Sequence, residues 1–127
     1  MGLVALVVDD SMLIRHTVCR FLEERGFVVT AVSNGQEAIE KVEHLRPSLI
    51  VTDIKMPKLD GIQLITKLKT KPQTAKIPII IVAGRQSGLD RAEKQADFVI
   101  YKDIDVESQL VKALTAIFGA AATAAKS

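Results

Sequence analysis

Short apolar runs alternate along the chain with segments in which apolar residues recur every three or four positions. The first run, at residues 3–8, is apolar throughout, as expected of a strand buried on both faces of a parallel sheet. A helical pattern with one apolar stripe follows from about Ser11 to Arg25, and Gly26 stands at the expected C-cap. These residues therefore predict a strand followed by an amphipathic helix.

The same alternation continues over the rest of the sequence. Further strands are predicted at 27–32, 49–52, 79–82 and 98–101. Further helices are predicted at 36–45, 61–69 and 106–118. Between Val82 and Phe98 the pattern is weak and predicts a short or poorly formed helix. We expect residues 1–119 to form one domain and the Ala-rich segment 120–127 to be a frayed C-terminal tail.

Five strands that alternate with helices predict an α/β protein, in which right-handed crossovers cover both faces of a parallel sheet. In open sheets of this kind, ligands bind beyond the carboxyl ends of the strands, at the point where the strand order reverses. We expect a doubly wound, five-stranded sheet of order 2-1-3-4-5, in which this reversal lies between the first and third strands.

The composition is that of an ordinary globular protein, with 48% hydrophobic and 25% charged residues among 127. A net charge of +2 is too small to indicate nucleic acid as a partner. The single cysteine, Cys19, excludes an intramolecular disulfide and a cysteine-based zinc site. The run at 3–8 is too short to span a membrane and lacks the flanks of a signal peptide. We therefore expect a cytoplasmic protein without membrane insertion.

Acidic residues directly follow two of the predicted strands. Asp9 and Asp10 come after the first strand and Asp53 after the third, so all three are expected in one pocket at the reversal of strand order. Because clustered carboxylates repel one another, such a pocket needs a cation, and a few oxygen ligands favour Mg²⁺. Lys102 follows the fifth strand and adds a positive charge at the same edge. A carboxylate, a metal ion and a lysine are the groups needed to accept a phosphoryl group.

At these residues the sequence resembles the response-regulator receiver family of two-component signalling, typified by the stand-alone chemotaxis receiver. The resemblance extends over essentially the whole chain. The residues that carry it are Asp9-Asp10, Asp53, Met56-Pro57, Asp60-Gly61, Ile77-Pro78 and Lys102. It implies the flavodoxin-like receiver fold and a signalling protein that turns over no external substrate.

The resemblance also implies a role for each site residue. Asp53 would take a phosphoryl group from a sensor histidine kinase or a histidine phosphotransfer protein. Mg²⁺ would be bound by Asp10, Asp53 and the backbone carbonyl of Lys55, with Asp9 acting directly or through water. Lys102 would contact the phosphoryl group. The output would pass to a downstream effector protein or to an output domain outside this sequence.

Three residues depart from the family pattern. Ala83 stands at the end of the fourth strand, where the family has a Ser or Thr hydroxyl, and Val99 replaces the aromatic switch residue. Asp103 replaces the proline that usually follows the lysine, so we expect a differently built loop there. We predict that Asp53 is phosphorylated but that the response is weaker than, or different from, the family norm. The alternative is a pseudo-receiver, a protein-interaction module that acts independently of phosphorylation.

Other functions require residues that the sequence lacks. A phosphatase of the haloacid dehalogenase type needs an acidic residue two positions after Asp53, where Lys55 stands. A P-loop is absent after the first strand, and Asp9 and Asp10 would repel the phosphate of a flavin. A structural alternative remains for these two aspartates, because on their own they could cap the first helix.

Overall fold

A computed structural model describes residues 3–54, 59–84, 96–102 and 105–119. Its strands form one parallel sheet in the predicted order, β2-β1-β3-β4-β5. The strands are β1 (Val4–Val8), β2 (Val28–Val32), β3 (Leu49–Asp53), β4 (Ile79–Ala83) and β5 (Phe98–Tyr101). The helices are α1 (Met12–Glu23), α2 (Gly35–Leu45), α3 (Gly61–Lys69), α4 (Pro72–Ala75) and α6 (Val106–Phe118).

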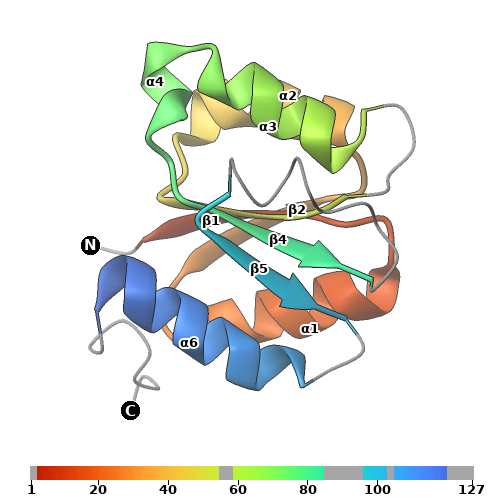
Figure 1. The fold of residues 1–127 in the computed structure, drawn as a ribbon, viewed down its shortest axis with the longest axis vertical. Helices are drawn as coiled ribbons and strands as arrows, with labels where there is room; N and C mark the ends of the chain where they lie inside the picture. The colour runs from red at the N-terminus through yellow and green to blue at the C-terminus, as the bar shows by residue number, and fades with distance from the viewer. Residues whose placement is uncertain (1–2, 55–58, 85–95, 103–104, 120–127) are drawn as a thin grey trace.

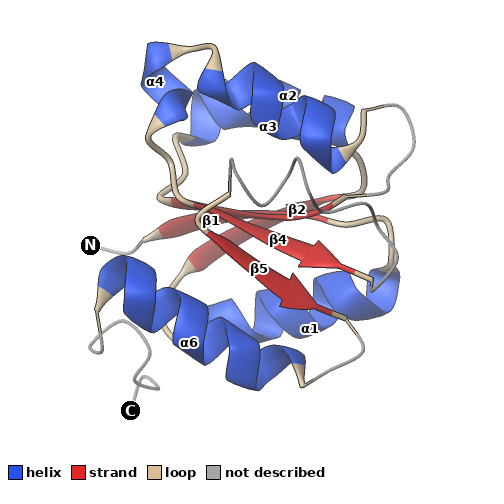
Figure 2. Ribbon diagram, in the orientation of Figure 1, coloured by secondary structure: helices blue, strands red, loops and turns tan. Residues whose placement is uncertain are grey.

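The helices cover both faces of the sheet, so the protein has three layers (Figure 1). Helices α2, α3 and α4 lie on one face, and α1 and α6 lie on the other (Figure 2). This is the doubly wound, flavodoxin-like arrangement that the sequence predicts. Within the described part of the chain, no helix is both long and apolar enough to cross a membrane.

Two apolar cores fill the space between the sheet and its helices. Between the sheet and α1 and α6, Phe21 and Leu110 pack with one set of strand residues. Between the sheet and the opposite helices, Ile65 and Leu68 pack with the other set. Successive side chains of a strand point to opposite faces, so a strand covered on both faces is apolar at every position. Residues of β3 and β4 are accordingly all buried, including Asp53 at the end of β3.

The predicted elements agree with the observed ones to within two residues at each end. Helix α1 ends ahead of Gly26, whose positive φ of 90° is the backbone conformation expected after a helix. The sequence prediction missed α4, a single turn in which the buried Thr74 hydroxyl donates to the Leu68 carbonyl at 2.6 Å. Most of the segment predicted as a weak helix (85–95), and the whole predicted tail (120–127), lie outside the described residues.

Candidate functional site

The carboxyl ends of β1 and β3 lie side by side at the centre of the sheet, because Val8 pairs with Thr52. Asp9 follows β1, and Asp53 is the last residue of β3. One carboxylate oxygen from each of Asp9, Asp10 and Asp53 lies within 4.8 Å of the other two. The expected convergence of three carboxylates at the reversal of strand order is therefore observed.

Asp53 is only 5% exposed, and both of its carboxylate oxygens accept hydrogen bonds. Oδ1 accepts from the backbone N–H of Ile54 at 2.7 Å, and Oδ2 accepts from Lys102 Nζ at 2.8 Å. The carboxylate is thus held in one orientation from two directions.

Helix α3 packs directly on the backbone of Asp53. The Gly61 N–H donates to the Ile54 carbonyl at 2.7 Å, and a Cβ at residue 61 would lie 2.2 Å from the Asp53 carbonyl oxygen. Only glycine permits so close an approach. Asp60 caps the helix in a reciprocal capping box with Gln63.

Asp9 is 2% exposed, and its two carboxylate oxygens have different surroundings. Oδ1 accepts from the Ser11 N–H at 2.8 Å, whereas the buried Oδ2 has no hydrogen-bond partner among the described residues. Burial raises the pKa of Asp9 to about 6, and the charge on Asp53 adds to this, although the hydrogen bond from Ser11 opposes it. An unpartnered buried carboxylate oxygen beside two further carboxylates is what a divalent cation with oxygen ligands would satisfy.

Lys102 supplies the positive charge of the site. Its Nζ lies 2.8 Å from Asp53 Oδ2 and 3.7 Å from Asp9 Oδ1. Burial lowers the pKa of Lys102, but the hydrogen bond to Asp53 and the nearby carboxylate charges outweigh this effect and raise the pKa above its usual value. Lys102 therefore carries its proton throughout the physiological pH range.

The turn between β1 and α1 is held by two contacts. Ser11 is the N-cap residue of α1, since its side chain accepts from the Ile14 N–H at 3.4 Å. Arg15 reaches back from the helix and donates to the Asp9 carbonyl at 2.7 Å. The N-cap is therefore Ser11 rather than either aspartate. The contact made by Arg15 is not indicated by the sequence pattern, in which this residue is only a polar position of an amphipathic helix.

The two switch positions lie near the site but carry no polar side chain. Ala83 is fully buried at the end of β4, and its carbonyl accepts from the Lys102 N–H at 3.0 Å. Val99 is partly buried in β5 opposite Ile81. Lys55, whose carbonyl the resemblance assigns to the metal, and Asp103 lie outside the described residues.

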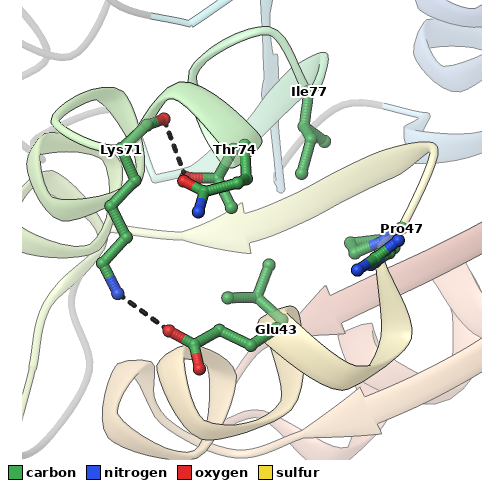
Figure 3. A pocket seen from close by; sticks show the side chains of 8 residues that line it. Glu43, Pro47, Lys71, Thr74 and Ile77 are labelled. Atoms are coloured by element: carbon green, nitrogen blue, oxygen red, sulfur yellow. Dashed lines mark hydrogen bonds and ion pairs between the residues drawn. The ribbon is translucent and has the colours of Figure 1, made fainter.

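A separate pocket of about 740 Å³ lies at the opposite end of the sheet, ahead of β3 and β4, between α2 and the turn that leads into α4 (Figure 3). An ion pair of 2.9 Å between Lys71 and Glu43 connects its two sides. The hydroxyl of Thr74, which also lines it, already donates to the Leu68 carbonyl. Lys71, Glu43 and Thr74 thus each have a hydrogen-bond partner within the protein, and the pocket shares no residue with the carboxylate cluster.

Comparison with known sequences identifies the family. The model of the response regulator receiver domain matches residues 5–115, and the chain belongs to this family. It is 31% identical over 98 residues to the chemotaxis protein CheY of Listeria monocytogenes, and the aligned region covers 75% of this chain and 82% of that protein. It is 36% identical over 116 residues to a gliding motility regulatory protein of Myxococcus xanthus, covering 87% of this chain but spanning only 15% of the relative's length.

Solved structures show the same fold. The chemotaxis response regulator CheY4 of Vibrio cholerae superposes with a TM-score of 0.83 at 25% identity, covering 93% of this chain and 100% of that one. The receiver domain of a sensor histidine kinase of Pseudomonas aeruginosa gives a TM-score of 0.80 at 23% identity, covering 91% and 97%. That protein is described with a magnesium ion coordinated in its active-site cleft. The chain is therefore a receiver domain of two-component signalling.

Proposed function

We propose that this receiver accepts a phosphoryl group on Asp53 from the phosphohistidine of a sensor histidine kinase or a histidine phosphotransfer protein. One observation carries the proposal: Lys102 Nζ lies 2.8 Å from the Asp53 carboxylate, within a cluster of three converging carboxylates. A carboxylate that must become an acyl phosphate needs positive charge on one side and a cation site on the other.

The transfer follows from the groups present. A carboxylate oxygen of Asp53 attacks phosphorus, the P–N bond to the donor imidazole breaks, and the imidazole nitrogen keeps the electron pair of that bond. The acyl phosphate carries more negative charge than the carboxylate that it replaces. Lys102, which keeps its proton, neutralises part of that charge from its position beside Asp53.

The acidic residues fit Mg²⁺. Asp9, Asp10 and Asp53 would hold the ion, and the family resemblance adds the backbone carbonyl of Lys55. The unpartnered Oδ2 of Asp9 supports this assignment, because Asp9 is otherwise an unfavourable place for a charge. When bound, the metal would neutralise charge on the equatorial phosphoryl oxygens. Asp10 is exposed, which leaves the mouth of the cluster open to a donor.

The surface beside the cluster favours a protein as the phosphoryl donor. Met12 and Leu13 form the start of α1, two and three residues after Asp10, and they are 75% and 73% exposed. Consecutive exposed apolar side chains of this size are typical of a protein contact surface. A partner whose histidine reaches Asp53 would cover them.

The proposal also includes the location and the output of the protein. Residues 1–119 would form the receiver domain, which would act in the cytoplasm without contacting nucleic acid. The output would pass to an effector protein or to a further domain.

The response to phosphorylation is expected to differ from that of other receivers. Ala83 has no hydroxyl to follow the phosphoryl group, and Val99 has no aromatic ring to change position. Both observations also favour the second candidate, a pseudo-receiver that binds its partner irrespective of phosphorylation.

Intact-mass measurement after incubation with acetyl phosphate and Mg²⁺ separates the two candidates. A single phosphoryl adduct that requires Mg²⁺ and is absent from Asp53→Ala supports the phosphoacceptor. Absence of an adduct in the wild-type protein, together with no binding of beryllium fluoride, would leave the pseudo-receiver. Asp60→Asn, which alters a helix-capping carboxylate outside the cluster, is the matched control and should retain the adduct.

A further inference from the structure

One side chain of α6 holds the end of the edge strand β5. Gln109 Oε1 accepts from the Tyr101 N–H at 2.9 Å, and Gln109 Nε2 donates to the Tyr101 carbonyl at 2.9 Å. Among the described strands, β5 pairs only with β4, so this side of Tyr101 faces away from the sheet. The side-chain amide of Gln109 therefore acts as one residue of an additional strand.

The same amide spans the connection between β5 and α6. Gln109 Nε2 also donates to the carbonyl of Asp105, the N-cap residue of α6, at 3.2 Å. Tyr101 and Asp105 are the residues on either side of the β5–α6 connection, so a single side chain holds both ends of it. The family resemblance leads one to expect a proline after Lys102, but Asp103 stands there. The chain thus lacks the ring that would restrict the backbone at this point.

The hydrogen bonds also fix the peptide unit that leads into Lys102. The carbonyl of Tyr101 and the N–H of Lys102 belong to one planar group. Its carbonyl accepts from Gln109 on the outer side, and its N–H donates to the Ala83 carbonyl at 3.0 Å on the inner side. Restraint from both sides fixes this peptide unit and therefore the position of the Lys102 Cα, from which the side chain starts.

The position of this Cα matters because the Lys102 side chain must reach across a strand. Asp53 ends β3, β4 lies between β3 and β5, and the lysine side chain is long and has several rotatable bonds. Its Nζ nevertheless lies 2.8 Å from Asp53 Oδ2. From this geometry we infer that Gln109 is a positioning residue for phosphoryl transfer: it holds the backbone from which Lys102 reaches Asp53. The inference rests on the proposed function of Asp53.

A double-mutant cycle tests whether Gln109 acts through Lys102. The rate of adduct formation with acetyl phosphate and Mg²⁺ is measured for Gln109→Leu in the wild-type and in the Lys102→Ala backgrounds. Displacing a charged group by about 1 Å slows a reaction considerably, so Gln109→Leu should lower the rate on the order of tenfold in the wild-type background. With Lys102 already truncated, the same substitution should change the rate by less than about twofold.

Controls separate positioning from a general loss of structure. Lys112→Gln alters an exposed side chain one turn further along α6 and should leave the rate unchanged. Gln109→Glu keeps the acceptor but points a carboxylate at two carbonyl oxygens, so it should be as slow as Gln109→Leu. In Gln109→Leu the Tyr101 and Lys102 amides should exchange faster with solvent. In both Gln109 variants far-UV circular dichroism at the assay temperature should remain that of the wild type.

The possible failures are distinguishable. A wild-type protein that forms no adduct contradicts the proposed function itself. An adduct that forms in the wild type and equally fast in Gln109→Leu overturns the positioning role alone. A rate loss of the same size in both backgrounds also overturns it, because Gln109 would then act on the fold and not through Lys102.

Discussion

Replacing Asp9 with asparagine should stabilise the metal-free protein near neutral pH. Asparagine keeps the shape of the side chain and an oxygen for the Ser11 N–H, which lies 2.8 Å from Asp9 Oδ1. It removes a negative charge that is 2% exposed and whose second oxygen has no partner among the described residues. The substitution therefore removes an unfavourable interaction, although it also removes a proposed metal ligand.

The magnitude follows from the pKa of Asp9, which burial and the charge on Asp53 raise from 3.8 to about 6. Each pKa unit corresponds to about 1.4 kcal/mol, so ionised Asp9 lowers the free energy of unfolding by up to roughly 3 kcal/mol. Because the folded-state pKa is the higher one, the native protein binds the extra proton. The wild-type protein thus gains stability as the pH falls through 6, and the gain is complete below 3.8.

Urea unfolding followed by circular dichroism, with EDTA present, measures the effect at several pH values. The free energy of unfolding of Asp9→Asn should exceed that of the wild type by about 1–3 kcal/mol above pH 7. The difference should shrink as the pH falls through 6 and disappear below about pH 3.8. Asp10→Asn, which neutralises an exposed carboxylate of the same cluster, is the control and should change stability by less than about 0.5 kcal/mol. A wild-type protein that is as stable as Asp9→Asn at neutral pH, or a difference that does not depend on pH, would refute the reasoning.

Three further predictions concern the other parts of the site. Gly61→Ala places a Cβ 2.2 Å from the Asp53 carbonyl, so the free energy of unfolding, measured by thermal unfolding, should fall by about 1–3 kcal/mol and adduct formation should slow. A melting temperature equal to that of the wild type would contradict this close contact. Lys102→Met removes the charge beside Asp53 and should slow phosphorylation by acetyl phosphate about 100-fold in a mass-spectrometric time course, whereas an unchanged rate would remove Lys102 from the mechanism. The double variant Met12→Ser, Leu13→Ser should keep the wild-type rate with acetyl phosphate but react more slowly with a phosphorylated histidine phosphotransfer protein. Equal slowing with both donors would contradict a role of these two side chains in binding the donor protein.

The fold could be predicted from the sequence largely because its central strands are buried on both faces. A strand such as β4, with five buried apolar residues, appears in the sequence as an uninterrupted apolar run. The helices between the strands show a single apolar stripe instead. The one-turn helix α4 was missed because a turn of four residues has no periodicity to detect. A hydrogen bond from the Thr74 hydroxyl to the Leu68 carbonyl connects it to the end of α3, and no periodic pattern reports such a contact.

The convergence of Asp9, Asp10 and Asp53 was predictable because they stand at the carboxyl ends of two parallel strands, and topology brings those strand ends together. The contacts of Arg15 and Gln109 were not. Both are side-chain hydrogen bonds to backbone groups, and they depend on how a helix is placed against the sheet. A polar position on an amphipathic helix has the same appearance in the sequence whether it faces solvent or holds a strand end.

Chemical identification of the modified residue tests the central claim most directly. Borohydride reduces an acyl phosphate to an alcohol, so a phosphorylated aspartate becomes homoserine, which peptide mass spectrometry can locate. After treatment with acetyl phosphate and Mg²⁺, we predict homoserine at residue 53 and unmodified aspartate at residues 9 and 10. Homoserine at either of those positions, or at none of the three, would contradict the assignment of Asp53 as the phosphoacceptor.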